Sequence, residues 1–436
     1  MAKAMSVMAT IRHEFFENKN GVLYIDGVSA LKLAEEFDTP LYVMSERRIR
    51  DNLRRLKEAL TRHYSKVRIY YSAKANTNLS VLKILEAEGA FLDAVSPGEV
   101  FLALKAGFPP EKILFTGTSV RSDELKFLVD SNMTINIDSL SQLKRLIRFH
   151  TPSLLSVRVN PEVGAGHHEH VVTGGKDSKF GIWEDDVVEA YRIAKKAGVK
   201  KFGIQMHIGS GNLTVEPFLL AMEKQLQICR HVKNEVGIDF EFIDIGGGIG
   251  VPYRPEEKQL DLDEFAEKVL ELFKKRTKEY GLGEPWFYVQ PGRYIVCDAV
   301  ALLTAANTVK VTPFKKFVGV DAGFNTLIRP VMYGSYHPMV VANKLNDPET
   351  ETYDVAGPLC ESGDFLARDR KLPKIEEGDL LAVLNVGAYG FSMSSQYNSR
   401  PRCAEVLVND GKCAVVRERE TFETLLKKQK IPPWLE

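Results

Sequence analysis

The feature that most constrains this chain is a regular alternation of short apolar runs with amphipathic helical patterns. Eight runs have the character of buried parallel strands, because each is almost continuously apolar rather than alternating. They are Arg68–Ser72, Phe91–Val95, Ile113–Thr116, Thr134–Ile137, Leu154–Val159, Gly203–His207, Glu241–Ile245 and Trp286–Gln290. Helical patterns separate them over Leu79–Glu88, Pro97–Ala106, Ser139–Phe149, Glu184–Ala197, Val215–Val236 and Leu262–Tyr280. Eight such units predict a (β/α)8 TIM barrel, with a doubly wound parallel sheet as the alternative.

The remainder of the chain changes character after about Ala301, where strands and turns replace helices. Strand-like runs lie at Phe317–Val320, Thr352–Val355, Leu380–Val386, Ala404–Val408 and Ala414–Val416, with a further one at Val22–Ile25. The segment Asn409–Asp410–Gly411 is a hairpin signal. We therefore expect an α/β chain with a C-terminal all-β domain. Residues 1–42 would join that domain, 43–298 would form the barrel and 299–436 the β-domain, which suits a barrel of roughly 250 residues.

The composition disfavours several classes of partner. Lys and Arg number 58 and Asp and Glu also number 58, so the net charge is zero and no basic tail favours nucleic acid. The apolar run within Met1–Thr10 is too short for a secretion signal, and no stretch approaches the roughly 18 apolar residues of a membrane span. Five cysteines without a C-x-x-C pair argue against a disulfide scaffold or a structural zinc site. We expect a cytoplasmic protein with a small-molecule partner, and neither nucleic acid nor membrane.

Residues capable of chemistry follow four of the predicted strands, at the end where such barrels place their active sites. Lys74 follows the first strand, and His207 ends the sixth and precedes Ser210. The glycines of Gly246–Gly250 follow the seventh strand, and Gln290–Arg293 follows the eighth. Glycines allow close backbone approach, so that N–H groups can hold a phosphate. Either glycine motif alone is as often a plain tight turn, but their positions after adjacent strands favour a phosphate site.

Lys74 is a candidate Schiff-base former, because burial between apolar neighbours favours the neutral amine. The alternative is a solvated lysine at the start of a helix. A phosphate site across the mouth of the same barrel makes an aldehyde cofactor with a phosphate arm the simplest explanation. His207 is placed to stack on an aromatic ring, although taken alone it is more commonly a satisfied core histidine.

These residues resemble the motifs of the fold type III, alanine-racemase-like decarboxylases that use pyridoxal 5'-phosphate (PLP). The motifs are Tyr71–Asn78 (YSAKANTN), His207–Ser210 (HIGS), Gly246–Gly250 (GGGIG), Pro291–Arg293 (PGR) and Cys360–Asp364 (CESGD). The diaminopimelate decarboxylase branch is particularly similar at Asn325–His337 and Val386–Arg402, and the likeness runs from about Tyr24 to Thr421. The resemblance implies decarboxylation of meso-2,6-diaminopimelate to L-lysine, a step of lysine biosynthesis. Another diamino or basic amino acid, or racemisation on the same fold, is the alternative.

The resemblance also implies roles for individual residues. Lys74 would bind PLP as a Schiff base, and His207 would stack on its pyridine ring. The remaining cofactor-binding residues would be Ser210, Gly247, Gly248, Gln290, Pro291, Gly292, Arg293 and Tyr389. Cys360 would protonate the carbanion carbon, for which an unperturbed thiol is a plausible acid. In this family that cysteine and Glu361 come from the other subunit, so a homodimer is implied.

Substrate recognition separates members of the family from one another. Arg293, Arg329, Tyr333 and Tyr389 resemble the family's residues that bind the substrate, and Glu361 resembles the partner of its distant ammonium group. A distant carboxylate calls for a bidentate arginine. A substrate of the ornithine or arginine type has a cationic tail and would not favour Arg329. The alternative for Arg329 is a surface salt bridge.

Three rival functions are open to sequence arguments. A racemase needs a second acid–base group on the opposite face, and the CESGD motif favours a decarboxylase instead. A non-catalytic PLP-binding protein would resemble the barrel alone, without the long β-domain. A metal-dependent hydrolase could use His167, His168 and His170, which lie in the glycine-rich loop Gly164–Gly175. Three histidines so close in a loop rarely reach one ion, and no carboxylate-rich motif accompanies them, so we expect no metal.

Gln290 departs from the family, which usually has a glutamate paired with the pyridine nitrogen at this position. A carboxylate keeps that nitrogen protonated, whereas a neutral amide supports the protonated ring less. We therefore predict that Gln290→Glu raises the rate of carbon dioxide release. An unchanged or lower rate in a variant that still binds PLP would count against this interpretation of the site.

Overall fold

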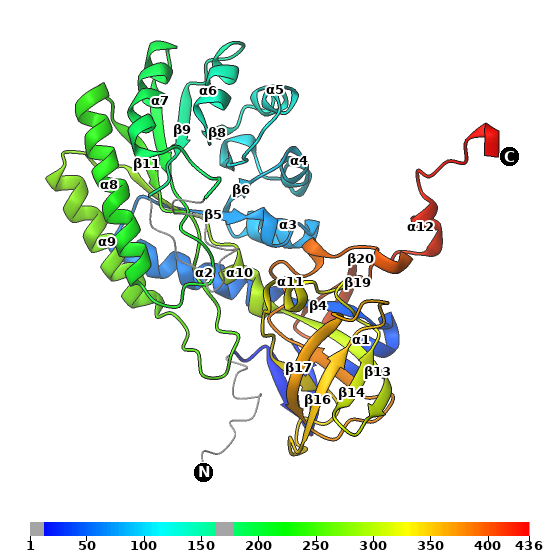
Figure 1. Cartoon of the computed structure of the whole chain (residues 1–436). Helices are drawn as coiled ribbons and strands as arrows, with labels where there is room; N and C mark the ends of the chain where they lie inside the picture. Colours follow the sequence, from blue (N-terminus) through cyan, green and yellow to red (C-terminus); the bar gives the residue numbers. More distant parts are fainter. Residues whose placement is uncertain (1–12, 162–177, 436) are drawn as a thin grey trace. The chain divides into compact units, whose positions relative to one another are not determined.

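The computed structural model describes residues 13–161 and 178–435 (Figure 1). The chain divides into two compact units. The first, called here the β unit, comprises Met1–Arg48, Tyr253–Glu256 and Cys297–Glu436. The second, the barrel unit, comprises Ile49–Pro252 and Glu257–Val296. The short segment Tyr253–Glu256 lies in the sequence between the two parts of the barrel unit but belongs to the β unit. The sequence alone had not assigned it there.

Eight parallel strands of the barrel unit close into a barrel in chain order. They are β5 (Val67–Ser72), β6 (Phe91–Ala94), β7 (Ile113–Phe115), β8 (Thr134–Ile137), β9 (Leu154–Arg158), β10 (Lys201–Gln205), β11 (Phe240–Asp244) and β12 (Trp286–Val289). All eight predicted strands are confirmed. The doubly wound alternative is wrong, because the last strand pairs with the first: Phe287 lies opposite Val67 and Val289 opposite Ile69.

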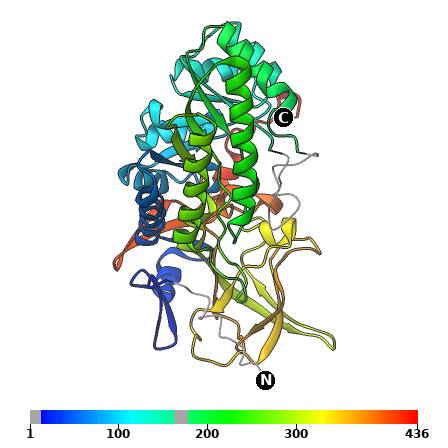
Figure 2. The same cartoon turned by 90° about the vertical axis from the view of Figure 1, so that its left-hand side faces the viewer.

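Helices alternate with these strands and cover the outside of the barrel (Figure 1). They are α3 (Leu79–Ala87), α4 (Pro97–Ala106), α5 (Ser122–Asp130), α6 (Leu140–Ile147), α7 (Glu184–Lys196), α8 (Glu216–Val236) and α9 (Leu262–Glu279). Figure 2 shows the two longest of them, α8 and α9, lying side by side. The predicted N-cap of α6 is confirmed, since Ser139 Oγ accepts a hydrogen bond of 3.2 Å from Gln142 N. The sequence missed α5 and also α2 (Glu46–His63), whose apolar positions are few among charged residues.

Aromatic side chains fill the barrel at the end where its strands begin. The rings of Phe242 and Tyr288 stack with centroids 4.3 Å apart, in a cluster with Tyr70 and Leu114. Gly203 leaves room for that stack, because a Cβ added there would come within 2.2 Å of the Phe242 ring. Apolar packing therefore occupies one end of the barrel and leaves the other end, where the strands stop, to polar side chains.

The β unit is built on a nine-stranded sheet whose strands come from two parts of the chain. Its strands are β4 (Leu41–Ser45), β13 (Val300–Val311), β14 (Lys316–Val320), β15 (Met339–Val341), β16 (Glu351–Ala356), β17 (Phe365–Leu372), β18 (Leu380–Val383), β19 (Ala404–Asn409) and β20 (Lys412–Arg417). The twelve-residue β13 pairs with β4 and β18 along its first half and with β14 along its second half. The five predicted C-terminal strands are confirmed, whereas β13, β15 and the charged β17 were missed.

The predicted N-terminal strand is present as β2 (Val22–Ile25) but does not pair within the large sheet. It forms a three-stranded sheet with β1 (Phe16–Lys19) and β3 (Val28–Ser29). Its side chains Leu23 and Ile25 pack into an apolar cluster with residues of the nine-stranded sheet. The N-terminal strand that does enter the sheet is β4, which lies between β13 and β19.

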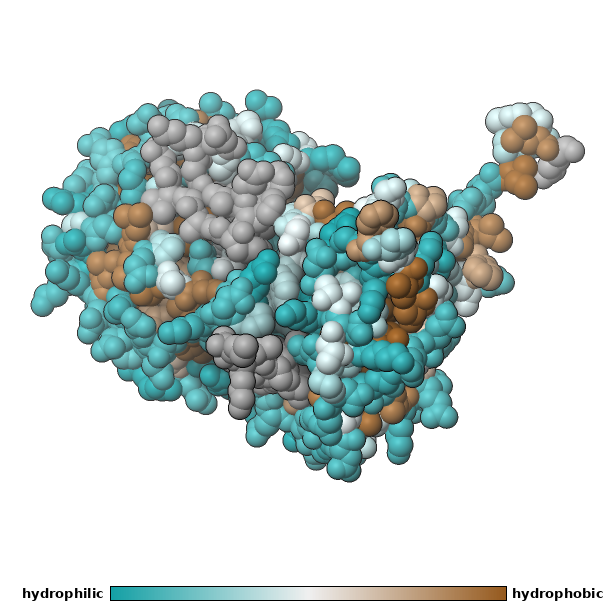
Figure 3. Space-filling view, turned by 60° about the horizontal axis from the view of Figure 1, so that its bottom comes forward, coloured by the Kyte–Doolittle hydropathy of each residue, from teal (hydrophilic) through white to brown (hydrophobic). Residues whose placement is uncertain are grey.

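Within the described ranges, no helix has both the length and the apolar character needed to cross a bilayer. The face drawn in Figure 3 carries mostly hydrophilic side chains, with hydrophobic ones in small groups between them.

Candidate active site

Lys74 lies in a single turn of 3-10 helix, Ala73–Ala75, directly after β5. Ser72, which precedes this turn, is bonded to the turn that follows β12. Its N–H donates to Pro291 O at 3.1 Å, and its hydroxyl lies 3.0 Å from both Gln290 O and Asp93 Oδ2. Pairing of the first and last strands thus holds the turn that carries Lys74 against the turn at Pro291.

The glycine turns after β11 and β12 are too close to neighbouring atoms to accept side chains. A Cβ on Gly247 would lie 2.3 Å from Gln290 O, and one on Gly292 would lie 3.1 Å from the Cβ of Ala75. Gly248 has φ +115°, which other residues rarely adopt. Arg293 Nε donates to Ser210 Oγ at 3.1 Å, which joins the loop after β10 to the turn after β12. The glycine turns therefore add no side chains to this region, which allows their backbone groups to approach an anion closely.

His207 is held in one orientation by the glycine turn beside it. Its Nδ1 accepts a hydrogen bond of 3.2 Å from Gly247 N, which places the proton of the neutral ring on Nε2. Burial lowers the pKa of His207 well below its usual value, and the positive charges of Lys74 and Arg158 act in the same direction. The imidazole is therefore neutral at pH 7 and suited to stack on a flat ring.

Gln290 belongs to a buried chain of amides that ends on a carboxylate. Gln205 Nε2 donates to Gln290 Oε1 at 3.0 Å, and Gln290 Nε2 donates to Asp244 Oδ2 at 2.9 Å. Burial raises the pKa of Asp244 well above its usual value, and the negative charge of Asp93 adds to that effect. A glutamate at 290 would place two carboxylates at hydrogen-bonding distance. The rise in rate predicted for Gln290→Glu therefore requires that Asp244 hold the proton that this pair shares.

Sequence reasoning missed the charged residues that the strands themselves carry to this end of the barrel. Asp93 Oδ1 accepts a hydrogen bond of 2.5 Å from Thr116 Oγ1. The guanidinium carbon of Arg158 lies 4.5 Å from the centre of the Phe180 ring. Burial lowers the pKa of Arg158. Together with Asp244, these residues stand inside the largely apolar runs FLDAV, LLSVRV and EFIDI. A charged residue in the second half of such a strand was the signal that could have identified them.

Glu99 is an ionisable group near this site whose pKa lies close to neutral pH. It lies in the first turn of α4, where its N–H donates to the N-cap Ser96 and its Oε2 accepts a bond of 2.7 Å from Val95 N. Burial raises the pKa of Glu99 to about 7, and the charge of Asp93 adds to this rise. The Val95 bond and the charge of Lys74 oppose it. The carboxyl therefore shares an electrostatic environment with the candidate cofactor lysine.

The β unit brings three of the predicted substrate residues together around α11 (Arg329–Tyr333). Arg329 is 1% exposed, and its guanidinium carbon lies 5.4 Å from the centre of the Tyr333 ring and 5.9 Å from those of Tyr253 and Tyr389. Its Nη2 donates to Ser335 Oγ, whereas its buried Nε has no hydrogen-bond partner among the described residues. The surface salt bridge considered for Arg329 is therefore wrong. A buried guanidinium that still has an N–H donor available is suited to bind a carboxylate.

Cys360 and Glu361 lie on a different loop of the β unit, where both are exposed. The loop is fixed from beneath by Asp364, whose carboxylate accepts bonds from Phe324 N at 2.7 Å and Leu359 N at 2.9 Å. Asn398 holds the cysteine itself, since its Nδ2 lies 3.2 Å from Sγ and its Oδ1 accepts from Cys360 N at 2.9 Å. The thiol is thus presented outward on a rigid support.

The predicted residues fall into separate groups in the structure. The barrel unit gathers Lys74, His207, Ser210, Gly247, Gly248, Gln290, Pro291, Gly292 and Arg293. In the β unit, Arg329, Tyr333 and Tyr389 are gathered, while Cys360 and Glu361 lie on another loop. The candidate metal histidines His167, His168 and His170 lie outside the described residues. Among the residues that are described, no group of three or more His, Cys, Asp or Glu side chains could hold a metal ion.

The barrel group suits a flat aldehyde cofactor with a phosphate arm. A lysine, a neutral histidine held by one ring nitrogen and a side-chain-free cradle supply a covalent attachment, a stacking surface and an anion site. Comparison with known proteins agrees. Residues 46–297 match the family model described as pyridoxal-dependent decarboxylase, pyridoxal binding domain.

Proteins similar over nearly the whole chain are diaminopimelate decarboxylases. One from Methanothermobacter thermautotrophicus is 58% identical over 95% of this chain and 97% of its own length. Another from Archaeoglobus fulgidus is 42% identical, covering 96% of this chain and all of the relative. The solved structure of the Methanocaldococcus jannaschii enzyme in complex with L-lysine superposes with a TM-score of 0.91 at 35% identity, over 99% of this chain and 100% of that one.

The raised pKa of Glu99 predicts a pH-dependent loss of stability that Glu99→Gln removes. A carboxyl with a folded-state pKa of about 7 keeps its proton when the unfolded chain, near its ordinary value, has lost it. The free energy of unfolding of the cofactor-free protein should therefore fall, relative to Glu99→Gln, as pH rises from about 4.5 to 7, by on the order of 2 kcal/mol. A glutamine can still accept the bond from Val95. Denaturant unfolding of the two proteins at pH 4.5, 6 and 8 measures this difference. If the difference in their free energies of unfolding were the same at all three pH values, the prediction would be wrong.

Proposed function

Because this chain belongs to the pyridoxal-dependent decarboxylases, we propose that it releases carbon dioxide from meso-2,6-diaminopimelate and forms L-lysine. The observation that carries the proposal is the bonding of the Lys74 turn to the glycine-lined turn after β12. This contact supports the proposal because it holds the turn that carries Lys74 against the turn that contains Gly292. The reaction places the protein in lysine biosynthesis.

Pyridoxal 5'-phosphate, when bound, supplies the sink for the electron pair left behind as carbon dioxide departs. In our proposal Lys74 attaches the cofactor covalently. The glycine turns at Gly247, Gly248 and Gly292 and the backbone of Arg293 would hold its phosphate, with hydroxyls from Ser210 and Tyr389. His207 stacks on the ring as a neutral imidazole, and Gln290, next to Pro291, bonds the ring nitrogen from a position fixed by Asp244.

The substrate selectivity of the chain would depend on how it binds the groups at the far end of the amino acid substrate. Arg329, caged by aromatic rings and with a spare buried donor, would bind the distant carboxylate together with Arg293, Tyr333 and Tyr389. Glu361 would bind the distant ammonium group. A buried cation without a compensating anion disfavours a cationic tail, which disfavours ornithine and arginine as substrates.

We also propose that the active site is completed in a homodimer. Cys360 and Glu361 are exposed on a loop that Asp364 and Asn398 hold rigid, so they are available to a second copy of the chain. Cys360 from that copy would return a proton to the carbon that lost its carboxyl group. A thiol that acts on a reactive carbon must be shielded from water, and a covering subunit provides this. We place the enzyme in the cytoplasm, in keeping with five cysteines that are all free.

Carbon dioxide release from four amino acids tests the proposed reaction. We expect turnover of meso-diaminopimelate and, with lysine, ornithine or arginine, rates lower by at least a hundredfold, because each lacks the distant carboxylate. Lys74→Ala should abolish both turnover and the visible absorbance of the bound cofactor. Arg329→Gln should raise KM for diaminopimelate with little change in absorbance. Faster turnover of ornithine or arginine than of diaminopimelate would refute the substrate assignment but not the cofactor assignment.

Mixed dimers test whether Cys360 serves the neighbouring subunit. Lys74→Ala and Cys360→Ala proteins should each be nearly inactive, yet after mixing and reassociation they should recover about a quarter of the wild-type activity. Half of the dimers would then be hybrids, each with one intact site. Mixing Lys74→Ala with His207→Ala is the matched control and should give no recovery, since both changes lie in the barrel unit. Absence of recovery in the first mixture would show that Cys360 acts within its own chain.

A further inference from the structure

The amide of Asn398 contacts Cys360 at two points, and hydrogen-bond chemistry decides which amide atom lies at each. Its Oδ1 accepts a bond of 2.9 Å from Cys360 N, and its Nδ2 donates to Cys360 Sγ at 3.2 Å. A backbone N–H can only donate, so the amide oxygen must face it and the amide N–H must face the sulfur. Asn398 therefore directs a hydrogen-bond donor at the thiol.

The backbone that carries this amide has an unusual conformation. Asn398 has φ +56° and Ser399 has φ +53°, both in the left-handed region that most residues avoid. Asparagine enters this region more readily than most side chains. Two consecutive residues in this conformation persist only where the surrounding structure holds them. The position of the amide thus depends on contacts made by the rest of the segment 395–402.

One buried carboxylate holds the segment 395–402 near both of its ends. Gln396 Nε2 donates to Glu420 Oε2 at 2.7 Å, and Arg402 N donates to the same oxygen at 3.0 Å. Arg402 Nε also donates to Glu420 Oε1 at 3.1 Å. The two ends of the segment are thereby fixed to one point, which leaves the residues between them little freedom to move.

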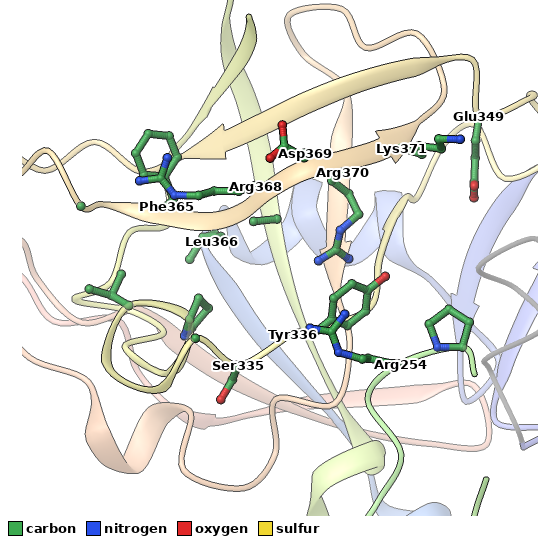
Figure 4. A pocket seen from close by; sticks show the side chains of 16 residues that line it. Arg254, Ser335, Tyr336, Glu349, Phe365, Leu366, Arg368, Asp369, Arg370 and Lys371 are labelled. Atoms are coloured by element: carbon green, nitrogen blue, oxygen red, sulfur yellow. The ribbon is translucent and has the colours of Figure 1, made fainter. Parts of the chain in front are cut away.

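The same segment is also tied to the loop that carries Cys360. The ring of Tyr397 stacks on the ring of Phe324, with centroids 5.3 Å apart, and Phe324 N donates to the Asp364 carboxylate beneath that loop. Where the loop ends, the ring of Phe365 lies 3.7 Å from the guanidinium carbon of Arg368, as Figure 4 shows beside a pocket of the β unit. Donor and thiol are therefore carried by two segments that are fixed to each other.

Contact with Asn398 limits the directions that the thiol can take. The side chain of a cysteine has three staggered rotamers, and an exposed cysteine can exchange among them. Asp364 bonds backbone groups of residues 324 and 359, whereas Asn398 reaches the sulfur itself. The contact favours the one rotamer in which Sγ lies beside Nδ2. It thus selects the direction from which Cys360 can give up its proton.

The donor also suits the charge that proton transfer leaves on the sulfur. In the transfer proposed for Cys360, the S–H bond breaks and its electron pair stays on sulfur. The proton forms a new C–H bond with the electron pair that carbon dioxide leaves on the substrate carbon. Hydrogen bonds to an ionised acceptor are stronger than those to a neutral one. The Asn398 N–H is therefore held more tightly by the thiolate than by the thiol.

We propose that Asn398 is a positioning residue for proton transfer, which directs the Cys360 thiol at the substrate carbon and stabilises the thiolate that remains. This inference rests on the proposed function, in which Cys360 is the proton donor. Because both residues belong to the β unit of one chain, they would enter the neighbouring active site as a preassembled pair.

The configuration of the L-lysine formed in D2O tests this proposal. A thiol held in one direction delivers deuterium to one face of the carbon, so the ε-carbon of the product should have a single configuration. Asn398→Asp keeps an oxygen for Cys360 N and a side chain that tolerates positive φ, but replaces the donor to sulfur by a carboxylate that repels a thiolate. We expect deuterium in both configurations from this variant, measured by NMR after chiral derivatisation.

Rates provide the second measurement. In the PLP-loaded protein, Asn398→Asp should lower kcat at least tenfold, within the range that general acid catalysis supplies. KM should change by less than about twofold, because the lost interaction belongs to the transition state. Asn20→Asp makes the same replacement at another exposed asparagine of positive φ (+55°) and should leave both rate and configuration unchanged. Asn398→Gly, which accepts the backbone conformation without a side chain, should behave as Asn398→Asp does.

Three results would overturn the proposal. One is a single configuration from both Asn398 variants, whatever their rates, since the thiol would then be directed by other groups. Another is a rise in KM that accounts for the whole loss of kcat/KM. The last is an equal effect of Asn20→Asp. Cys360→Ala separates this inference from the proposed function. If that variant retained the rate and the single configuration, Cys360 would not be the proton donor; if it alone lost them, only the role of Asn398 would be wrong.

Discussion

The pairing of β12 with β5 is the interaction on which the candidate site depends. It closes the barrel and brings the turn after the first strand against the turn after the last, where Ser72 bonds to Gln290 and Pro291. Lys74 follows Ser72 by two residues, and Gly292 packs against Ala75. Two turns that are more than 200 residues apart in the chain, one carrying Lys74 and the other Gly292, thus become neighbours through backbone contacts.

The barrel interior is divided into two zones along its strands. Stacked aromatic rings occupy the end where the strands begin, and buried charges and amides occupy the end where they stop. In the second zone each ionisable group affects the others: Asp93 raises the pKa of Asp244 and Glu99, while Lys74 and Arg158 lower that of His207. Such mutual shifts of pKa values are common where proton transfer or charge stabilisation is required. They follow from packing several charges into a region that water reaches poorly.

The strands, the fold class and the positions of the glycine turns could be predicted from the sequence because each depends on local patterns. A continuous apolar run marks a buried strand, and a barrel fixes which end of that strand carries chemistry. Asp93, Arg158 and Asp244 escaped because a pattern of apolar residues treats one charge as an interruption. Contacts such as that of Gln205 with Gln290 depend on which strands become neighbours, and the cage of rings around Arg329 depends on a turn at Tyr389 with φ +59°. Neither can be read from spacing along the chain.

The closure of the barrel also bears on how the protein is made. The edge of β5 that will accept β12 is synthesised early, and the strand that covers it leaves the ribosome more than 200 residues later. During that interval a nascent chain carries an unpaired, apolar strand edge, which invites association with other chains. Until the last strand arrives, the turn that carries Lys74 lacks its contact with the turn at Pro291. This end of the barrel can therefore assemble only late in the synthesis of the chain.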